Sequence, residues 1–237
     1  MVPVFGLKYK PKLINLDTGQ EENILVVGAH SDDPIYGMGG TLIKLIDEGK
    51  NIYTIIMSYG EMSHPHLNRE EIIKIRVSEA KKANQLIGGK EIMFYGLREG
   101  KFEEDFYKKH FDDRMIDFII SKKITKIFTH IDADLHPDHI ATNKIVLDIY
   151  NRLPKNVRDK ISIYGFDIWN VTNVKHVSYP KVYVKITKQL KKKLEAIKVF
   201  KSQSLTWFSL VWNLIIKSFF LGLKIKSFFA ERFYKIK

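Results

Sequence analysis

The chain contains no cysteine among its 237 residues. Disulfide bonds and thiolate metal sites are therefore excluded, and the composition fits a reducing compartment. The first twenty residues have no apolar stretch long enough for a secretory signal peptide, so we expect a cytoplasmic protein. Internal repeats and low-complexity segments are also absent. Hydrophobic residues make up 45% of the chain, which at this length predicts one domain with a sizeable core.

Apolar runs alternate with helical patterns along most of the chain. The first strand-like run begins at Ile24. Further strand-like runs cover residues 51–58, 91–95 and 124–129, and β-rich runs cover 161–170 and 182–186. Helical patterns cover 69–87, 114–121 and 188–202. This alternation predicts an α/β fold, a Rossmann-like, mostly parallel sheet flanked by helices. We assign residues 1–202 to this domain and residues 203–237 to a C-terminal helical segment packed on it or on a membrane.

A cluster of polar side chains ends the first of these runs. Residues 24–40 read ILVVGAHSDDPIYGMGG, so His30, Ser31, Asp32 and Asp33 fall where a strand turns into a helix. Ligands of open α/β sheets bind at such turns, at the carboxyl ends of strands. The alternative is structural, because Ser31 is a good helix N-cap and acidic residues suit a first helical turn.

A second cluster, DLHPDH at 134–139, follows another apolar run and precedes another helical pattern. If the two strands are neighbours in a parallel sheet, both clusters lie at the same edge. His30, Asp33 and His139 can then meet around a metal as two imidazoles and one carboxylate, with one position left for water, as in catalytic zinc sites. Asp32 and His136 are left over as a carboxylate and an imidazole beside the metal.

These motifs resemble those of the LmbE-like or PIG-L de-N-acetylases, an AHPDDE-like turn and a later HxDH. The similarity continues through nearly the whole chain, in Arg76, Glu79 and Ala80 before Leu86 and Gly88, in YGFDIW at 164–169, in KLEAIKVFKSQ at 193–203, and in Ala230, Glu231 and Phe233. Ser31 replaces the family's usual proline and Pro34 its usual glutamate. Neither departure removes a proposed ligand, and proline in a first helical turn costs little.

The resemblance implies a hydrolase that removes an acetyl group from an N-acetylated sugar, an N-acetylglucosamine-type unit of a glycoconjugate or its precursor. The substrate would be carried on a nucleotide, a lipid or another group. We expect one Zn²⁺ per chain, although another divalent metal would suit the same donors. A membrane-associated sugar-lipid deacetylase is the first alternative. A non-catalytic sugar or nucleic-acid binding protein is less favoured, because all five polar groups are retained.

Roles can be assigned to the remaining site residues. Asp32 would take a proton from water and return it to the leaving amine. His136, charged or as a neutral N–H donor, would stabilise the oxyanion, and Asp138 would orient that imidazole. Arg76 falls where the family carries an arginine that contacts substrate. The alternative for Arg76 is a helix-surface charge paired with Glu79 or Glu70.

Two further histidines, His64 and His66, lie in the loop at 59–68. We interpret both as solvated loop residues, because three better metal ligands are available.

Positive charge is concentrated at the C-terminal end. Residues 1–180 contain 25 Lys and Arg against 25 Asp and Glu, whereas residues 181–237 contain 14 against 2. This block indicates an anionic partner such as a phosphate-bearing ligand, a membrane surface or a nucleic acid, or else a solvated helix face.

The same region is rich in aromatic residues. In residues 207–216 only Ser209 and Asn213 are polar, yet Lys217 leaves the run short of the roughly 20 residues that span a bilayer. A helix here would be apolar around most of its circumference. It must pack against the core, another subunit of an oligomer, or the interfacial zone of a membrane, as a peripheral contact on its inner face.

Overall fold

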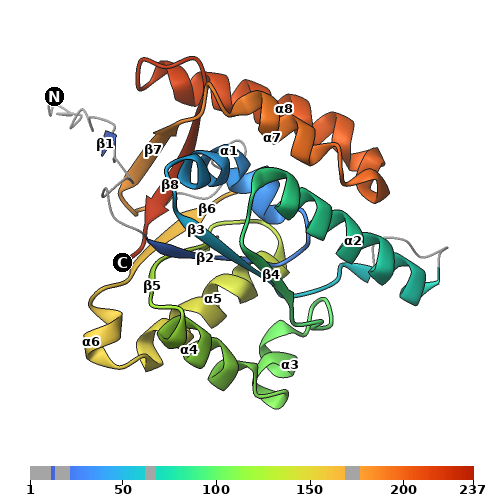
Figure 1. Ribbon diagram of the computed structural model, residues 1–237, viewed down its shortest axis with the longest axis vertical. Helices are drawn as coiled ribbons and strands as arrows, with labels where there is room; N and C mark the ends of the chain where they lie inside the picture. Colours follow the sequence, from blue (N-terminus) through green and yellow to red (C-terminus); the bar gives the residue numbers. More distant parts are fainter. Residues whose placement is uncertain (1–11, 14–21, 62–67, 169–176) are drawn as a thin grey trace, which may run out of the picture.

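The structure is a computed structural model that describes residues 12–13, 22–61, 68–168 and 177–237, and for residues 12–13 and 204–209 the backbone alone. Eight strands form one sheet in the order β1-β7-β8-β6-β5-β2-β3-β4. They are β1 (Lys12–Leu13), β2 (Asn23–Gly28), β3 (Asn51–Ile56), β4 (Glu91–Phe94), β5 (Ile124–His130), β6 (Ser162–Phe166), β7 (Lys181–Lys185) and β8 (Ala230–Lys235). Within the described chain only the pairs made by β8 are antiparallel. The predicted mostly parallel α/β sheet is confirmed (Figure 1).

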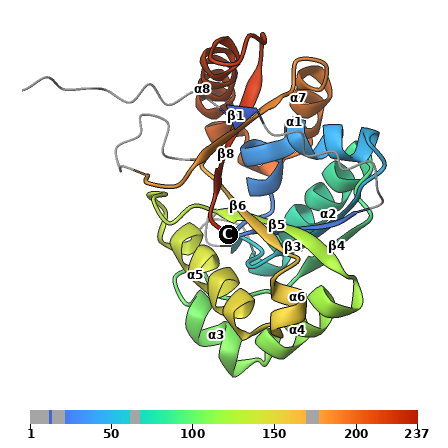
Figure 2. The same ribbon diagram turned by 90° about the vertical axis from the view of Figure 1, so that its left-hand side faces the viewer.

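Helices cover both faces of the sheet, which gives three layers (Figures 1 and 2). One face carries α1 (Asp33–Asp47), α2 (Arg69–Ile87), α7 (Leu190–Ile197) and α8 (Ser204–Leu223), and the other carries α3 (Phe102–Lys108), α4 (Phe111–Ser121), α5 (Pro137–Arg152) and α6 (Lys155–Arg158). Each face has its own hydrophobic core. Successive residues of β2 alternate between them, with Ile24 and Val26 in one core and Leu25 and Val27 in the other.

Strand β2 lies where the strand order reverses. From β2 the chain adds β3 and β4 on one side and then crosses over to add β5 and β6 on the other. Strands β2 and β5 are parallel neighbours, with Leu25 beside Ile127 and Val26 beside Phe128. Such a reversal leaves a crevice at the carboxyl ends of the strands, where ligands of α/β sheets bind. The condition for the two polar clusters to meet is therefore fulfilled.

The prediction of a helical segment over residues 203–237 is only partly right. A 3₁₀ turn, η2 (Lys201–Gln203), leads into α8, but the chain then turns back and forms β8 between β6 and β7. At Gly222, in the last turn of α8, an added Cβ would lie 2.5 Å from the backbone oxygen of Phe228. The returning chain thus packs directly on this glycine. The segment belongs to the α/β domain itself, and the proposed boundary at residue 202 falls inside it.

The sequence pattern did not predict β8, because this strand carries charged side chains that are buried inside the sheet. Glu231 lies 2.6 Å from Lys193 Nζ, and Arg232 Nη2 lies 3.2 Å from Asp167 Oδ2. Buried charges are tolerated only when they are paired, and both partners here are distant in sequence. The local pattern of β8 therefore resembles a solvated segment, and only the tertiary contacts make it a central strand.

Candidate active site

The first polar cluster lies on the turn from β2 into α1. Asp32 is the N-cap residue of α1, but its side chain makes no capping hydrogen bond, and Ser31 is not the cap. The capping role of Ser31 is therefore wrong, whereas Asp33 does lie in the first turn of α1, as the structural alternative also expected. Asp33 Oδ2 accepts a hydrogen bond of 2.7 Å from the backbone N–H of His30, which holds the turn closed.

The second polar cluster lies between β5 and α5. Asp134 accepts hydrogen bonds from the backbone N–H groups of His136 at 3.1 Å and Ile168 at 3.2 Å. His136 is the N-cap of α5, and its Nδ1 accepts a hydrogen bond from the N–H of Asp138 at 3.2 Å. These contacts fix the start of α5, so that His139 is buried and directed at the β2 turn.

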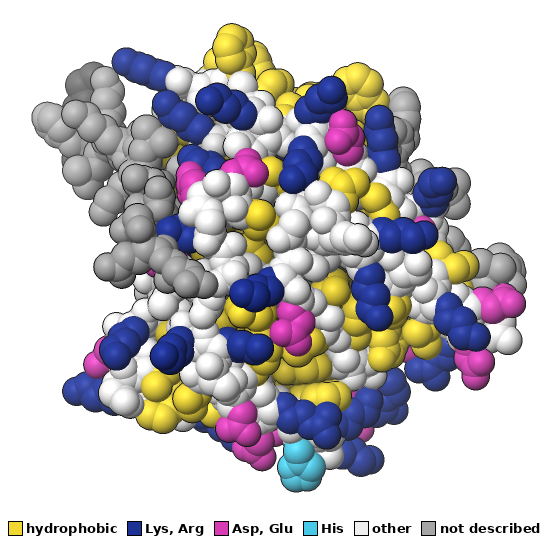
Figure 3. Space-filling model, in the orientation of Figure 1, with side chains coloured by type: hydrophobic (Ala, Val, Ile, Leu, Met, Phe, Trp, Pro, Cys, Tyr) yellow, Lys and Arg dark blue, Asp and Glu magenta, His cyan; other side chains and the backbone are white. Residues whose placement is uncertain are grey.

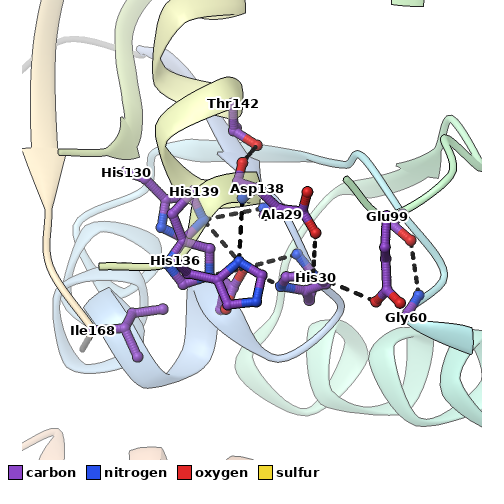
Figure 4. A network of polar contacts seen from close by, with 12 residues as sticks. Ala29, His30, Gly60, Glu99, His130, His136, Asp138, His139, Thr142 and Ile168 are labelled. Carbon is purple, nitrogen blue, oxygen red and sulfur yellow. Dashed lines mark hydrogen bonds and ion pairs between the residues drawn. The ribbon is translucent and has the colours of Figure 1, made fainter. Parts of the chain in front are cut away.

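The two clusters meet at Asp33. Its Oδ2 lies 3.4 Å from His30 Nδ1 and 3.4 Å from His139 Nε2. Figure 4 shows His30, His136, Asp138 and His139 converging from the two turns. The three residues expected to bind a metal are thus brought together, and ligand atoms of all three lie within 4.8 Å of one another.

The second nitrogen of each imidazole faces a carboxylate. His30 Nε2 lies 3.4 Å from Asp138 Oδ2, and His139 Nδ1 lies 3.1 Å from Asp134 Oδ1. Metal-ligating histidines usually present the non-ligating nitrogen to such a group, which fixes the ring and raises its basicity. The buried His139 has a carboxylate beside each ring nitrogen, Asp33 at Nε2 and Asp134 at Nδ1. This donor set fits a divalent metal ion.

Asp138 does not have the predicted contact. We expected its carboxylate to orient His136, but it accepts a hydrogen bond from Gly100 N at 2.8 Å and faces His30. Its hydrogen bond to His136 is made by the backbone N–H. A carboxylate oxygen of Asp138 lies within 4.8 Å of a ring nitrogen of His136, but its closer partners are Gly100 and His30.

The ionisation of these groups is strongly coupled. Burial opposes charge on Asp33, but the His139 and His130 imidazoles outweigh it and hold the pKa of Asp33 well below its usual range. Burial likewise opposes charge on His30, yet its hydrogen bonds to Asp138 and Asp33 raise its pKa to about 10. The pKa of His139 is raised to about 9 because Asp33 and Asp134 overcome the cost of burial. In the protein without metal the site is thus held together by imidazolium and carboxylate charges.

The pKa of Asp32 is shifted in the opposite direction to that of Asp33. Burial, reinforced by the neighbouring Asp33 carboxylate, raises the pKa of Asp32 to about 6. It lines a pocket of about 200 Å³ together with His30, His136 and Arg76. A carboxylate with a pKa near neutrality can both accept and return a proton at working pH.

His136 presents one nitrogen to the same pocket. Burial and the neighbouring His139 and His30 lower its pKa, so the ring is neutral at pH 7. Because Nδ1 accepts the capping hydrogen bond, the proton of the neutral ring is on Nε2. The lowered pKa therefore favours the second of the two expected forms of His136, the neutral N–H donor.

Arg76 is buried rather than exposed on the helix surface, with 3% of its side chain accessible. It lines the pocket, whereas Glu79 is engaged by the backbone and hydroxyl of Ser202 at 2.9 and 2.6 Å. With the Gln203 amide oriented to suit both neighbours, its nitrogen donates to Asp32 Oδ2 at 3.1 Å and its oxygen accepts from Arg76 Nη2 at 3.3 Å. The surface-charge alternative for Arg76 is thus wrong.

Sequence reasoning missed four residues of this site. His130 ends β5, stacks on His139 with ring centroids 3.8 Å apart, and places Nε2 3.1 Å from Asp33. Asp134 supports His139, Glu99 lies 3.5 Å from His30, and Gln203 joins Asp32 to Arg76. Asp134 is the first residue of the second cluster and His130 ends the strand before it, so their position at this strand end was a usable signal. Glu99 and Gln203 lie in connections that carry no such signal.

Helix α1 is interrupted at Met38, and side chains from the C-terminal part of the chain bond to the backbone groups near this interruption. Met38 leaves helical geometry (φ −147°, ψ 17°), which frees backbone groups inside the helix. Glu231 accepts hydrogen bonds from the N–H groups of Gly40 at 3.0 Å and Thr41 at 2.7 Å, and Lys193 donates to the oxygen of Tyr36 at 2.8 Å. The buried Lys193–Glu231 pair thus holds the helix whose first turn carries Asp32 and Asp33.

One other group of potential metal ligands in the described chain lies away from this site. It consists of His110, Asp112 and Asp113. His110 and Asp113 are exposed, and Asp112 is engaged by Arg152 at 2.8 Å, so we interpret it as surface charge. His64 and His66 lie outside the described residues.

Comparison with known proteins identifies the family. Residues 25–150 match the family described as PIG-L, GlcNAc-PI de-N-acetylase. This range is more than half of the chain and contains both polar clusters, so the protein belongs to the PIG-L (LmbE-like) family, a family of deacetylases.

Curated relatives act on N-acetylated sugars according to their names. A Bacillus anthracis protein named "Probable N-acetyl-alpha-D-glucosaminyl L-malate deacetylase 2" is 25% identical over 78% of this chain and 83% of its own length. The diacetylchitobiose deacetylase of Thermococcus kodakarensis is 25% identical over 80% of this chain and 73% of its own.

Solved structures confirm the fold. The N,N'-diacetylchitobiose deacetylase of Pyrococcus horikoshii aligns with a TM-score of 0.75 and 22% identity over 98% of this chain and 87% of its own. GalB of Pseudomonas putida KT2440, a 4-carboxy-2-hydroxymuconate hydratase, aligns with a TM-score of 0.77 and 16% identity over 91% of this chain and 96% of its own. The fold therefore carries more than one reaction, and the reaction has to be argued from the site.

Proposed function

We propose that this protein is a zinc-dependent hydrolase that removes the acetyl group from an N-acetylglucosamine-type sugar. The observation that carries the proposal is the convergence of His30, Asp33 and His139 beside Asp32, a carboxylate whose pKa is raised to about 6. Two imidazoles, one carboxylate and a neighbouring proton acceptor are what metal-assisted amide hydrolysis requires.

His30, Asp33 and His139 would hold the metal, and Asp138 and Asp134 would support the two imidazoles. Nitrogen and oxygen donors in this number favour zinc over magnesium or calcium, which prefer all-oxygen sites. When bound, the ion supplies Lewis acidity at the acetyl carbonyl and activates water.

Asp32 acts as the base that takes the proton of the attacking water and as the acid that returns it to the leaving amine. Its raised pKa suits both steps, and the contact with Gln203 fixes one of its oxygens. His136 donates its Nε2–H to the oxyanion of the tetrahedral intermediate. Arg76 binds the substrate beside Asp32, as its place in the pocket wall suggests.

The substrate class follows from the relatives named above, which act on N-acetylglucosaminyl malate and diacetylchitobiose. The test is acetate release by the purified protein from N-acetylglucosamine, its malate conjugate and diacetylchitobiose. We expect activity that is lost with a chelator and restored by zinc, and that Asp32→Asn lacks. A zinc-loaded protein that releases no acetate but hydrates an unsaturated dicarboxylic acid would place it with the hydratase instead.

A further inference from the structure

The outward side of α8 is apolar. Trp212, Ile216, Phe219, Phe220 and Leu223, which we call the α8 outer face, are between 38 and 59% exposed. Phe228, in the turn that follows, is 71% exposed. Hydrophobic side chains gather along the upper edge of the molecule in Figure 3, where α8 lies, with Lys and Arg side chains beside them. Contiguous apolar surface of this kind marks an interaction site.

Two polar side chains of the same helix, Lys217 and Ser218, turn towards the protein, whereas Asn213 is exposed. Lys217 Nζ lies 2.6 Å from Asp167 Oδ2 under the helix, and Ser218 is buried beside it. Val211 and Leu221 pack inward as well. The helix is therefore held by its inner side, and the fold gives no reason for five large apolar side chains on the outer one.

Exposed positive charge borders the α8 outer face. Lys224 and Lys226 are exposed at its end, and Lys188 adjoins Thr187, whose Oγ1 lies 3.0 Å from Ser227 Oγ in the same turn. The cations act on one another, since burial together with Arg232 and Lys224 lowers the pKa of Lys181. Glu231 is the one acidic residue of residues 201–237, and it is buried against Lys193. Within residues 201–237 the exposed charged side chains are therefore all positive, and one exposed carboxylate, Asp47, lies nearby, 3.4 Å from Gln189 beside Lys188.

We propose that the α8 outer face docks into the interfacial zone of a membrane that contains anionic lipids. The apolar side chains would enter the boundary between headgroups and acyl chains, while Lys188, Lys224 and Lys226 would contact lipid phosphates. Within the described chain no helix is long and apolar enough to cross a bilayer, so the contact lies on the membrane surface. A second copy of the chain fits less well, because a two-fold contact centred on α8 would bring two sets of Lys224 and Lys226 together, and residues 201–237 offer no exposed acidic partner.

Cosedimentation with vesicles tests the proposal. We expect the protein to pellet with vesicles of phosphatidylcholine and phosphatidylglycerol and much less with phosphatidylcholine alone. Raising the salt should release only part of it, because the Debye length falls from about 10 Å at 0.1 M to about 3 Å at 1 M while apolar burial persists. In a Trp169→Phe/Trp207→Phe variant, Trp212 is the remaining tryptophan, and its emission should shift to the blue on anionic vesicles.

Variants separate the apolar and the charged contributions. Ile216→Ser/Phe220→Ser should lower the partition coefficient about tenfold or more. Lys224→Gln and Lys226→Gln should each lower it about fivefold. Matched controls are Ile120→Ser on α4, 40% exposed, and Lys155→Gln on α6, which lie at the opposite end of the molecule (Figure 1). The controls should bind like the parent, and all variants should keep its melting temperature.

Three outcomes would overturn the proposal. One is the absence of pelleting with anionic vesicles at low salt. A second is vesicle binding that the α8 variants and the controls affect equally. The third is a dimer in sedimentation velocity that Ile216→Ser/Phe220→Ser dissociates, without any vesicle binding, which would make a second copy the partner. None of these measurements depends on deacetylase activity, so the proposed function is tested separately.

Discussion

His30 and His139 each lie between Asp33 and a second carboxylate, Asp138 or Asp134. This arrangement restricts each ring to one orientation before any metal arrives. Preorganisation of this kind increases affinity, because no conformational entropy has to be lost when the metal binds.

We predict that His30→Ala and His139→Ala lose most of the bound metal, whereas Asp134→Asn and Asp138→Asn weaken binding by about 10- to 100-fold. Competition with a chromophoric chelator measures the affinity, and elemental analysis measures the content. Asp132→Asn is the control, because Asp132 is exposed in the same loop. Full metal content in His139→Ala would disprove the ligand assignment.

Asp32 and His136 should affect turnover without affecting metal content. We expect Asp32→Asn to lower kcat by about 10² to 10⁴ and His136→Ala by about 10² to 10³. The parent's kcat/KM should fall below about pH 6, because the pKa of Asp32 is raised to about 6 and its protonated form cannot accept a proton. His136→Ala should keep this acid limb. Asp32→Asn with parental turnover would require another base.

Metal binding should release protons. In the metal-free protein the pKa of His30 is about 10 and that of His139 about 9, so both rings are cationic at pH 7.5. Ligation requires neutral imidazole, and we therefore expect release of about two protons per ion. Titration calorimetry in buffers of different ionisation enthalpy measures this number. A heat that is independent of the buffer would contradict the expectation.

Helix α1 is a broken element whose two parts are joined through distant side chains. Glu231 accepts hydrogen bonds from the first N–H groups of the second part, Gly40 and Thr41, and Lys193 donates to the Tyr36 carbonyl of the first part. The turn that carries Asp32 and Asp33 therefore depends on α7 and β8, which lie far from it in sequence.

Lys193→Met should destabilise the protein by about 3 to 5 kcal/mol, because it leaves Glu231 buried without its partner. Urea unfolding measures the change. Lys191→Met, at an exposed position of the same helix, should change stability by less than about 0.5 kcal/mol. Equal stability of the two variants would mean that the pair does not support α1.

The whole molecule is built on one sheet, and the last strand of the chain lies inside that sheet rather than at its edge. Strand β8 lies between β6 and β7, so the chain closes the sheet only after residue 230. Because β8 pairs with both of these strands, we expect the C-terminal segment to be required for folding, and it also carries the candidate docking surface.

A chain that ends at Ser202 should therefore fail to fold. The truncation removes β8 and separates β7 from β6, which leaves unpaired strand edges and exposes both cores. Circular dichroism and thermal unfolding of the truncated chain measure the outcome. The full-length Ile216→Ser/Phe220→Ser variant is the control, since it alters α8 without touching the sheet. Cooperative unfolding of the truncated chain would restore residue 202 as a domain boundary.

The sequence by itself determined the strands that lead into both polar clusters and the candidate metal ligands that follow them. Runs such as Ile24–Gly28 and 124–129 are local signals, because burial of a parallel strand requires consecutive apolar residues. His30, Asp33 and His139 follow directly from those runs once the strands are neighbours.

Only the tertiary structure decided the place of β8, the partner of Asp138 and the parts played by Glu99, His130 and Gln203. Each depends on contacts between residues far apart in the chain, such as Glu231 with Lys193 and Gly40. A charged residue in a sequence looks solvated until its partner is known, because the free energy of burying it depends on that partner. For this reason the charged and amide groups around the site could be assigned only after folding had brought them together.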